Sequence, residues 1–189
     1  GPAGSGKHTL TRILSAAMQC EGRSGKIPCG VCSGCRKALE GVHPDIITVD
    51  DPDHKAMTVD PIRAARSDMF ILPNEGKRKI YIIPRGQDLG APSQNALLKI
   101  LEEPPEYAVF LILTTSAERL LPTIRSRAVQ LQLSPLSYEQ AIPELKRRFP
   151  DKRDLELADA LEQAEGYLGP ACEALRDGLF LPQALALAN

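Results

Sequence analysis

The chain has 189 residues, of which 43% are hydrophobic and 25% are charged, and its formal net charge at pH 7 is −1. This length and composition are typical of a globular protein with a substantial core and exclude a disordered chain. The near-zero charge excludes a protein that coats nucleic acid over its whole surface. The apolar runs are too short to cross a bilayer and no secretion signal is recognisable, so we expect a cytoplasmic protein without a membrane partner.

The chain opens with GPAGSGKH, which fits the phosphate-binding pattern G-x-x-x-x-G-K-[ST] except at its last position. Gly1, Gly4 and Gly6 would let backbone N–H groups close around a phosphate, and Lys7 would reach the outer phosphates. His8 stands where a hydroxyl group should bind Mg²⁺, and an imidazole does not replace that hard oxygen ligand. An amphipathic helix follows, as such a loop requires, although a helix-capping loop with a chance lysine is the alternative.

Strand-like runs lie at 45–49, 79–83, 109–113 and 129–133, and helical patterns separate them, one of which covers 93–103 before Pro104 and Pro105. Alternating strands and helices predict an α/β fold with a parallel sheet covered on both faces. A phosphate loop normally follows a strand, and none precedes Gly1. We therefore expect a fragment that lacks its first strand, with a protease scar at Gly1 and Pro2 as the alternative.

The strand signals end near Ser134, so we expect an α/β domain at 1–133 and a small all-helical domain at 134–189. Ser137 and Gln140 form a capping-box pair that opens one helix. Gly166 ends a second helix, and Pro170 occupies a favoured first-turn position of a third.

Four of the five cysteines lie between positions 20 and 35 in the spacing C-x8-C-x2-C-x2-C. Two-residue spacings let tight turns point neighbouring thiolates at one ion, which predicts a structural zinc site. The ligands would be Cys20, Cys29, Cys32 and Cys35. Free cysteines packed as small hydrophobic residues and an iron–sulfur cluster are the alternatives, but the C-x3-C-P continuation of ferredoxins is missing. His43 could compete as a ligand, or it could be an ordinary loop histidine.

In a working ATPase, acids at the end of a hydrophobic strand hold Mg²⁺. The strand at 79–83 is the candidate for this position. Pro84 and Arg85 follow it instead, and Asp88 lies too far beyond the strand end. Together with His8, this pattern favours a degenerate nucleotide site. Mg²⁺ is not expected there, and binding of ATP or ADP is left open.

Several segments in the same order resemble the bacterial clamp-loader ATPase family of the AAA+ class. They are HPDI at 43–46, NALLKILEEPP at 95–105, LILTT at 111–115 and LLPTIRSRAVQLQL at 120–133, together with the cysteine cluster. Within that family the chain is similar to the delta prime branch of DNA polymerase III. The resemblance implies a three-layer P-loop domain with a zinc module, a helical lid, and a C-terminal collar domain that lies outside this sequence.

The resemblance also assigns roles to single residues. Arg127, in the Ser-Arg-Ala version of the family's Ser-Arg-Cys motif, would be an arginine finger that is offered to the ATP of a neighbouring subunit. The alternative is that Arg127 caps the helix at 122–126. Thr114 or Thr115 would be the sensor 1 residue, or both would simply end a strand. Gly169 occupies the place of the sensor 2 arginine of the motor subunits.

The resemblance therefore implies a non-catalytic component of the DNA polymerase III holoenzyme that supplies Arg127 while a sliding clamp is loaded on primed DNA. Its partners would be the gamma/tau motor subunits and the delta subunit, and it would reach the clamp and the primer–template DNA through the assembled complex. An active gamma/tau-like ATPase and an iron–sulfur electron carrier are the alternatives. Arg36, Lys37, Arg63, Arg66 and the basic run at 74–79 either contact DNA or are solvated faces.

Overall fold

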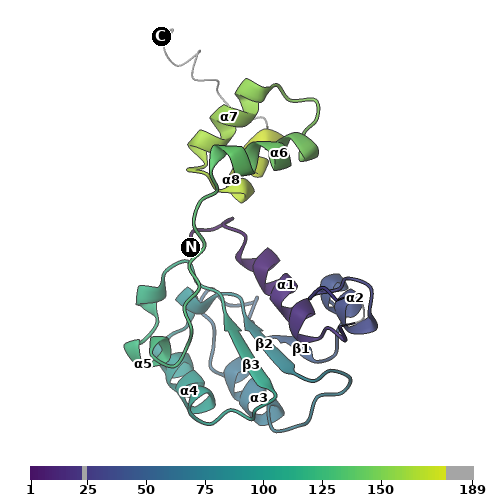
Figure 1. Ribbon diagram of the computed structural model, residues 1–189. Helices are drawn as coiled ribbons and strands as arrows, with labels where there is room; N and C mark the ends of the chain where they lie inside the picture. Colours follow the sequence, from purple (N-terminus) through teal and green to yellow (C-terminus); the bar gives the residue numbers. More distant parts are fainter. Residues whose placement is uncertain (23–24, 178–189) are drawn as a thin grey trace. The chain divides into compact units, whose positions relative to one another are not determined.

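The computed structural model describes residues 1–22 and 25–177, which form two compact units (Figure 1). One unit is His8–Leu131, and the other combines Gly1–Lys7 with the described residues from Gln132 on. The sequence pattern places the segment Gly1–Lys7, called the phosphate loop below, in the α/β domain. The structure groups this segment with the helical unit. The reason is a direct packing contact, because Gly4 lies against Pro170.

The α/β unit contains a three-stranded parallel sheet in the order β1-β2-β3. Its strands are β1 (Ile46–Thr48), β2 (Lys79–Ile83) and β3 (Ala108–Ile112). Ile80 of the central strand is in register with Ile46 on one side and Val109 on the other. Four of the five residues of β2 are buried, as expected for the central strand of a sheet with helices on both faces. Three of the four predicted strands are thus confirmed.

Helices α1 and α2 lie on one side of this sheet, and α3 and α4 lie on the other (Figure 1). The helices of this unit are α1 (Lys7–Met18), α2 (Ser33–Glu40), α3 (Asp60–Asp68), α4 (Ala91–Glu102) and α5 (Pro122–Arg125), with short 3-10 turns at Gly86–Asp88 and Ala117–Arg119. The core between the sheet and α3 and α4 includes Tyr81, Ile83, Leu97 and Ile100. The helix predicted at 93–103 is therefore confirmed with a start two residues earlier, where Pro92 fits the first turn.

The strand predicted at 129–133 is wrong. These residues form no strand, and Val129 and Leu131 are 90% and 67% exposed. A strand exists only through hydrogen bonds to a neighbour, and among the described strands β3 pairs with β2 alone. The alternating pattern therefore identified residues suited to a strand but not the partner that a strand requires.

The helical unit contains α6 (Tyr138–Arg148), α7 (Asp154–Gln163) and α8 (Leu168–Asp177). Its separate core includes Ala141, Leu145, Leu157, Leu161 and Leu175. Gln140 Oε1 accepts a hydrogen bond from the backbone N–H of Ser137 at 3.2 Å, as the capping pair predicted. Helix α8 begins two residues before Pro170. None of the helices in 1–22 and 25–177 combines the length and apolar character that a bilayer crossing demands.

Candidate metal and nucleotide sites

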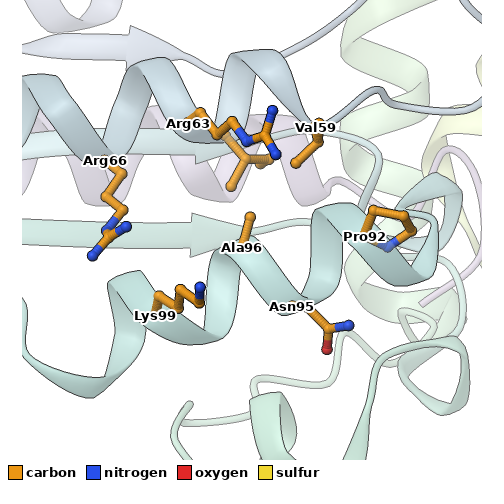
Figure 2. A pocket seen from close by; sticks show the side chains of 8 residues that line it. Val59, Arg63, Arg66, Pro92, Asn95, Ala96 and Lys99 are labelled. Carbon is orange, nitrogen blue, oxygen red and sulfur yellow. The ribbon is translucent and has the colours of Figure 1, made fainter.

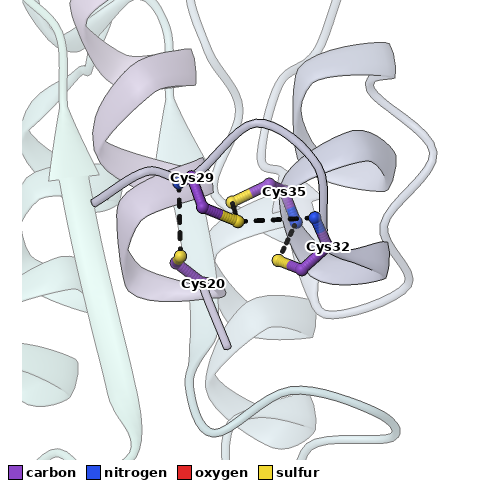
Figure 3. Close-up of side chains that lie close together, drawn as sticks. All are labelled: Cys20, Cys29, Cys32 and Cys35. Atoms are coloured by element: carbon purple, nitrogen blue, oxygen red, sulfur yellow. Dashed lines mark hydrogen bonds between the residues drawn. The ribbon is translucent and has the colours of Figure 1, made fainter. Parts of the chain in front are cut away.

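The four clustered cysteines converge on one point beside α1 and α2 (Figure 3). Their sulfur atoms all lie within 4.8 Å of one another, and Cys29 Sγ lies 3.9 Å from Cys35 Sγ. Cys20 follows the end of α1, while Cys32 and Cys35 are brought in by the first turn of α2. The two-residue spacing therefore acts as predicted, because a tight turn and a helix start direct neighbouring thiols inward.

Backbone N–H groups surround these sulfur atoms. The amides of Cys29, Cys32 and Cys35 donate at 3.4 Å to the sulfurs of Cys20, Cys29 and Cys32 respectively. Donation from the backbone of Val31 and Cys32 lowers the pKa of Cys29 to about 6, whereas burial raises the pKa of Cys35 to about 12. Four thiolates at such distances repel one another, so a bound cation is needed to hold all four deprotonated.

The donor set fits a tetrahedral metal ion. A Zn–S bond of about 2.3 Å in a regular tetrahedron gives sulfur–sulfur distances of about 3.8 Å, close to the 3.9 Å between Cys29 and Cys35. Four protein ligands leave no position for a reacting water, so such a site serves structure. Within residues 1–22 and 25–177 this is the one cluster of His, Cys and acidic residues that could hold a metal.

His43 lies outside the cysteine cluster, which agrees with the second of its two interpretations, an ordinary loop histidine. Its Nδ1 accepts a hydrogen bond from the backbone N–H of Asp45 at 3.1 Å. Asp45 itself is fully buried and accepts hydrogen bonds from the backbone of Asn74, Glu75 and Gly76. The HPDI segment thus anchors the loop that leads into β2.

The phosphate loop closes on itself through its lysine. Lys7 Nζ donates at 2.7 Å to the carbonyl oxygen of Gly1 and also contacts the carbonyl oxygen of Pro2. Gly4 and Gly6 adopt φ values of 71° and 89°, which other residues rarely tolerate. The loop therefore has a curled backbone, and the Lys7 ammonium group at its end contacts the carbonyl oxygens at its beginning. Burial lowers the pKa of Lys7. His8 is exposed on the first turn of α1.

The loop packs against the start of α8, backbone against backbone. A Cβ atom placed on Gly4 would lie 2.5 Å from Pro170 Cδ, and one placed on Gly169 would lie 2.7 Å from Gly4 Cα and collide with the Gly4 carbonyl oxygen. Neither position has space for a side chain. The glycine at position 169 is therefore required by this packing.

Arg85 forms the centre of a network at the carboxyl ends of β1 and β2. Its Nε and Nη2 lie 2.9 and 2.8 Å from Asp50 Oδ1, and its other donors reach the carbonyl oxygens of Asp51, His54 and Lys55. An ATPase needs carboxylates that face a metal ion at this edge of the sheet. At this edge the Arg85 guanidinium is paired with Asp50.

Thr114 and Thr115 follow β3 at the same edge of the sheet. Thr114 Oγ1 donates at 2.8 Å to the carbonyl oxygen of Ser116 and accepts from the Ser116 N–H. The backbone N–H of Thr115 donates to Gln87 Oε1 at 3.2 Å. These contacts are those of a strand end, which is the plainer of the two interpretations of these residues.

Arg127 lies just beyond α5 with its side chain 39% exposed. Its Nη1 donates at 3.1 Å to the carbonyl oxygen of Thr123, and its Nη2 lies 3.5 Å from Glu102 Oε1. The helix-end contact that was the alternative to a finger role is thus present, and the guanidinium still has donors that face solvent. The structure brings Arg127 together with the end of α4.

A pocket between α3 and α4, called here the basic groove, is lined by positively charged side chains (Figure 2). Arg63 and Arg66 come from α3, and Lys99 comes from α4. Pro92, Asn95 and Ala96, which also belong to α4, line the groove beside Lys99. The groove thus offers three cationic groups and an amide to a phosphate-bearing ligand, and two of those cations belong to the set singled out in the sequence.

Three contributors to these sites were missed in the sequence. Asp50 pairs with Arg85 across 35 positions, Gln94 holds the segment before α5, and Glu102 faces Arg127. Glu102 belongs to the LEEPP segment that supports the family resemblance, so its position was visible while its partner was not. No local pattern marks Asp50 or Gln94, because their partners are distant in sequence.

Several proteins are similar to this chain over most of its length. The chain is 36% identical to the DNA polymerase III subunit tau of Escherichia coli K12 over 188 residues, which is 98% of this chain and 28% of that protein. It is also 36% identical to the DNA polymerase III subunit delta prime of Pseudomonas aeruginosa over 165 residues, which is 86% of this chain and 49% of that protein. The chain therefore spans between about a quarter and a half of these two relatives.

A solved structure of a DNA polymerase III gamma subunit-related protein from Thermotoga maritima is also similar, with a TM-score of 0.48 and 25% identity over 76% of this chain and 52% of that one. The family model described as "DNA polymerase III, delta subunit" matches residues 1–137. That match covers the phosphate loop, the cysteine cluster, the Arg85 network and Arg127. The chain belongs to this DNA polymerase III delta-subunit family.

Proposed function

We propose that this chain is the AAA+ and lid portion of a delta prime subunit, which does not hydrolyse ATP itself and gives Arg127 to the ATP of a neighbouring motor subunit. It would act within the DNA polymerase III clamp loader as a sliding clamp is placed on primed DNA. Its partners would be the gamma/tau and delta subunits. The relatives at 36% identity include both tau and delta prime subunits, so the choice between them rests on the site.

The observation that carries this proposal is the ion pair between Arg85 and Asp50 at the position where a motor holds its metal ion. A magnesium-binding carboxylate must be free to face the ion, and Asp50 is engaged by two nitrogen atoms of one guanidinium. A second cation beside this pair would be repelled by Arg85. His8 offers no hydroxyl group, so the chain lacks both protein ligands that a nucleotide-bound Mg²⁺ requires.

The glycine at position 169 supports the same choice. A motor subunit of the resembled family would place a guanidinium at this position, but here the backbone of Gly4 fills the space that its Cβ would need. The loop itself retains Lys7 and its curled backbone, so binding of ATP or ADP without turnover is compatible with the arrangement. Arg127, in contrast, has solvent-facing donors that suit a γ-phosphate.

The cysteine cluster would hold a structural zinc ion. Its four sulfur donors and their spacing match the preference of zinc for tetrahedral thiolate sites. When bound, zinc would tie the end of α1 to the start of α2. The basic groove between α3 and α4 would face the phosphates of DNA in the assembled complex, because three cations line it.

The decisive experiment is Arg127→Ala in a reconstituted clamp loader. We expect the DNA-stimulated ATPase rate at the neighbouring motor site to fall by about 10³-fold, the scale of an arginine finger. Arg119→Ala, which removes another exposed arginine of the same region, should leave the rate unchanged. An unchanged rate in the Arg127→Ala loader would reduce Arg127 to a helix-end contact and refute the proposal.

A second candidate is an active gamma/tau-like ATPase, which is favoured by the intact curl of the phosphate loop around Lys7 and by the tau relative. It predicts that the purified subunit hydrolyses ATP and that Lys7→Ala abolishes the turnover. We expect no turnover above background.

A further inference from the structure

We propose that Glu102 is the positioning residue for Arg127. It would hold the guanidinium ordered at the surface until the triphosphate of a neighbouring subunit replaces its carboxylate. This inference rests on the proposed finger role of Arg127 and names a second residue on which that role depends. Glu102 itself would touch neither nucleotide nor metal.

Two anchors hold the Arg127 side chain. The carbonyl oxygen of Thr123 accepts a hydrogen bond from Arg127 Nη1 at 3.1 Å, and Glu102 Oε1 lies 3.5 Å from Arg127 Nη2. The two anchors come from different elements, since Thr123 belongs to α5 and Glu102 is the last residue of α4. The guanidinium group is rigid and planar, so contacts at two of its nitrogens restrict the side chain to few rotamers. Its remaining N–H groups stay available to donate to a phosphate.

The backbone that carries Arg127 is fixed by the same helix α4. Gln94 is 7% exposed, and its Nε2 donates at 3.0 Å to the carbonyl oxygens of both Leu89 and Arg119. Its Oε1 accepts a hydrogen bond from the N–H of Leu121 at 2.7 Å, directly before α5 begins. Helix α4 therefore secures the start of α5 through Gln94 and the guanidinium beyond α5 through Glu102.

The strength of the Glu102 contact suits a residue that must be released. The side chains of Arg127 and Glu102 are 39% and 53% exposed, so solvent screens their attraction. A triphosphate carries more charge than a carboxylate and can bind the guanidinium in a bidentate manner. The pair would thus order Arg127 before the partner arrives without competing strongly against the partner's phosphate.

The test is Glu102→Gln in the reconstituted loader, with Glu103→Gln as a matched control. Both variants remove one exposed negative charge from neighbouring positions, but only Glu102 contacts Arg127. We expect Glu102→Gln to lower the kcat of the DNA-stimulated ATPase about two- to fivefold at unchanged KM, the range of an exposed ion pair. We expect Glu103→Gln to match the wild type. Equal rates for the two variants, or a faster Glu102→Gln loader, would overturn the inference.

The Arg127→Ala background separates this inference from the proposed function. If Glu102 acts through Arg127, then Glu102→Gln has no further effect on kcat when Arg127 is already alanine. A further loss in that background would show a merely structural role and overturn the inference. A large loss in Arg127→Ala together with wild-type behaviour of Glu102→Gln would overturn the positioning role alone. Wild-type behaviour of Arg127→Ala would overturn the finger itself.

A second readout does not depend on turnover. The side-chain Nε–Hε NMR signal of Arg127 in the full subunit should broaden or shift toward the exposed-arginine average in Glu102→Gln and stay in place in Glu103→Gln. An Arg127 signal that is identical in the two variants would contradict the positioning role.

Discussion

Arg85 Nη2 lies 2.8 Å from Asp50 Oδ1, and the two residues follow β2 and β1 at the carboxyl end of the sheet. The pair also ties down a loop, since the same guanidinium donates to the carbonyl oxygens of His54 and Lys55. The contacts of Arg85 therefore hold the segment after β1 against the end of β2.

The first prediction concerns this corner. Arg85→Ala leaves Asp50 and the carbonyl oxygens of residues 51–55 without their donor, so we expect the free energy of unfolding to fall by about 2 to 3 kcal/mol. Arg63→Ala, which removes an exposed arginine with one 3.5 Å ion pair, should change it by less than about 0.5 kcal/mol. Urea denaturation followed by circular dichroism measures both. Equal effects of the two variants would mean that the Arg85 network contributes nothing.

The second prediction concerns the metal. We expect the purified protein to be colourless and to contain one zinc ion per chain by elemental analysis, because four sulfurs that lie within 4.8 Å of one another suit a tetrahedral thiolate site. Cys35→Ser should lose the ion and lower the melting temperature, whereas Cys172→Ser, which changes a cysteine of the helical unit, should retain it. Visible absorbance with bound iron would instead support the iron–sulfur alternative.

The third prediction is a pH dependence from Asp45. Burial opposes its ionisation, but donors from the backbone of Asn74, Gly76 and Glu75 outweigh it and hold the pKa of Asp45 below its usual value. A carboxyl group with a depressed pKa in the folded state stabilises the fold fully above its unfolded pKa of about 3.9. This stabilisation is lost as pH falls from there through the lower folded pKa.

Asp45→Asn tests this pH dependence. An amide cannot accept from all of these donors, so we expect a loss of about 2 kcal/mol at pH 7 and a flatter decline of stability below pH about 4. Asp53→Asn changes an exposed acid and should preserve the wild-type profile. Unfolding curves at a series of pH values decide the matter, and parallel profiles for Asp45→Asn and the wild type would contradict the assignment.

The fourth prediction concerns the contact between the phosphate loop and α8. Gly169→Ala forces a methyl group against Gly4, and we expect a loss of about 2 to 3 kcal/mol in the free energy of unfolding. Gly90→Ala, whose new Cβ would meet nothing closer than 3.7 Å, should cost less than about 1 kcal/mol. Gly169→Arg should not create ATPase activity, because it disrupts the packing instead of supplying a sensor. Thermal melts and an ATP turnover assay check the two parts.

Much of this protein could be predicted from patterns that are local in the chain. The strands at 79–83 and 109–113, helix α4 before its two prolines and the Gln140 cap were predicted because neighbouring residues determine hydrophobic periodicity, helix ends and capping. The cysteine cluster was predicted for the same reason, since three of its four members lie within seven residues. The strand at 129–133 failed because pairing, unlike periodicity, depends on a distant segment.

The sequence by itself predicted the thiol cluster and the parallel sheet, and it contains the phosphate-loop pattern and places Pro84 and Arg85 directly after β2. Only the tertiary structure decided that Arg85 pairs with Asp50, that Glu102 meets Arg127 and that Gly169 packs on Gly4. Each of these pairs joins residues that are between 25 and 165 positions apart. Such contacts arise from the packing of whole elements, and a single sequence carries no local signal for the partner of an arginine or for the backbone that a glycine must accommodate.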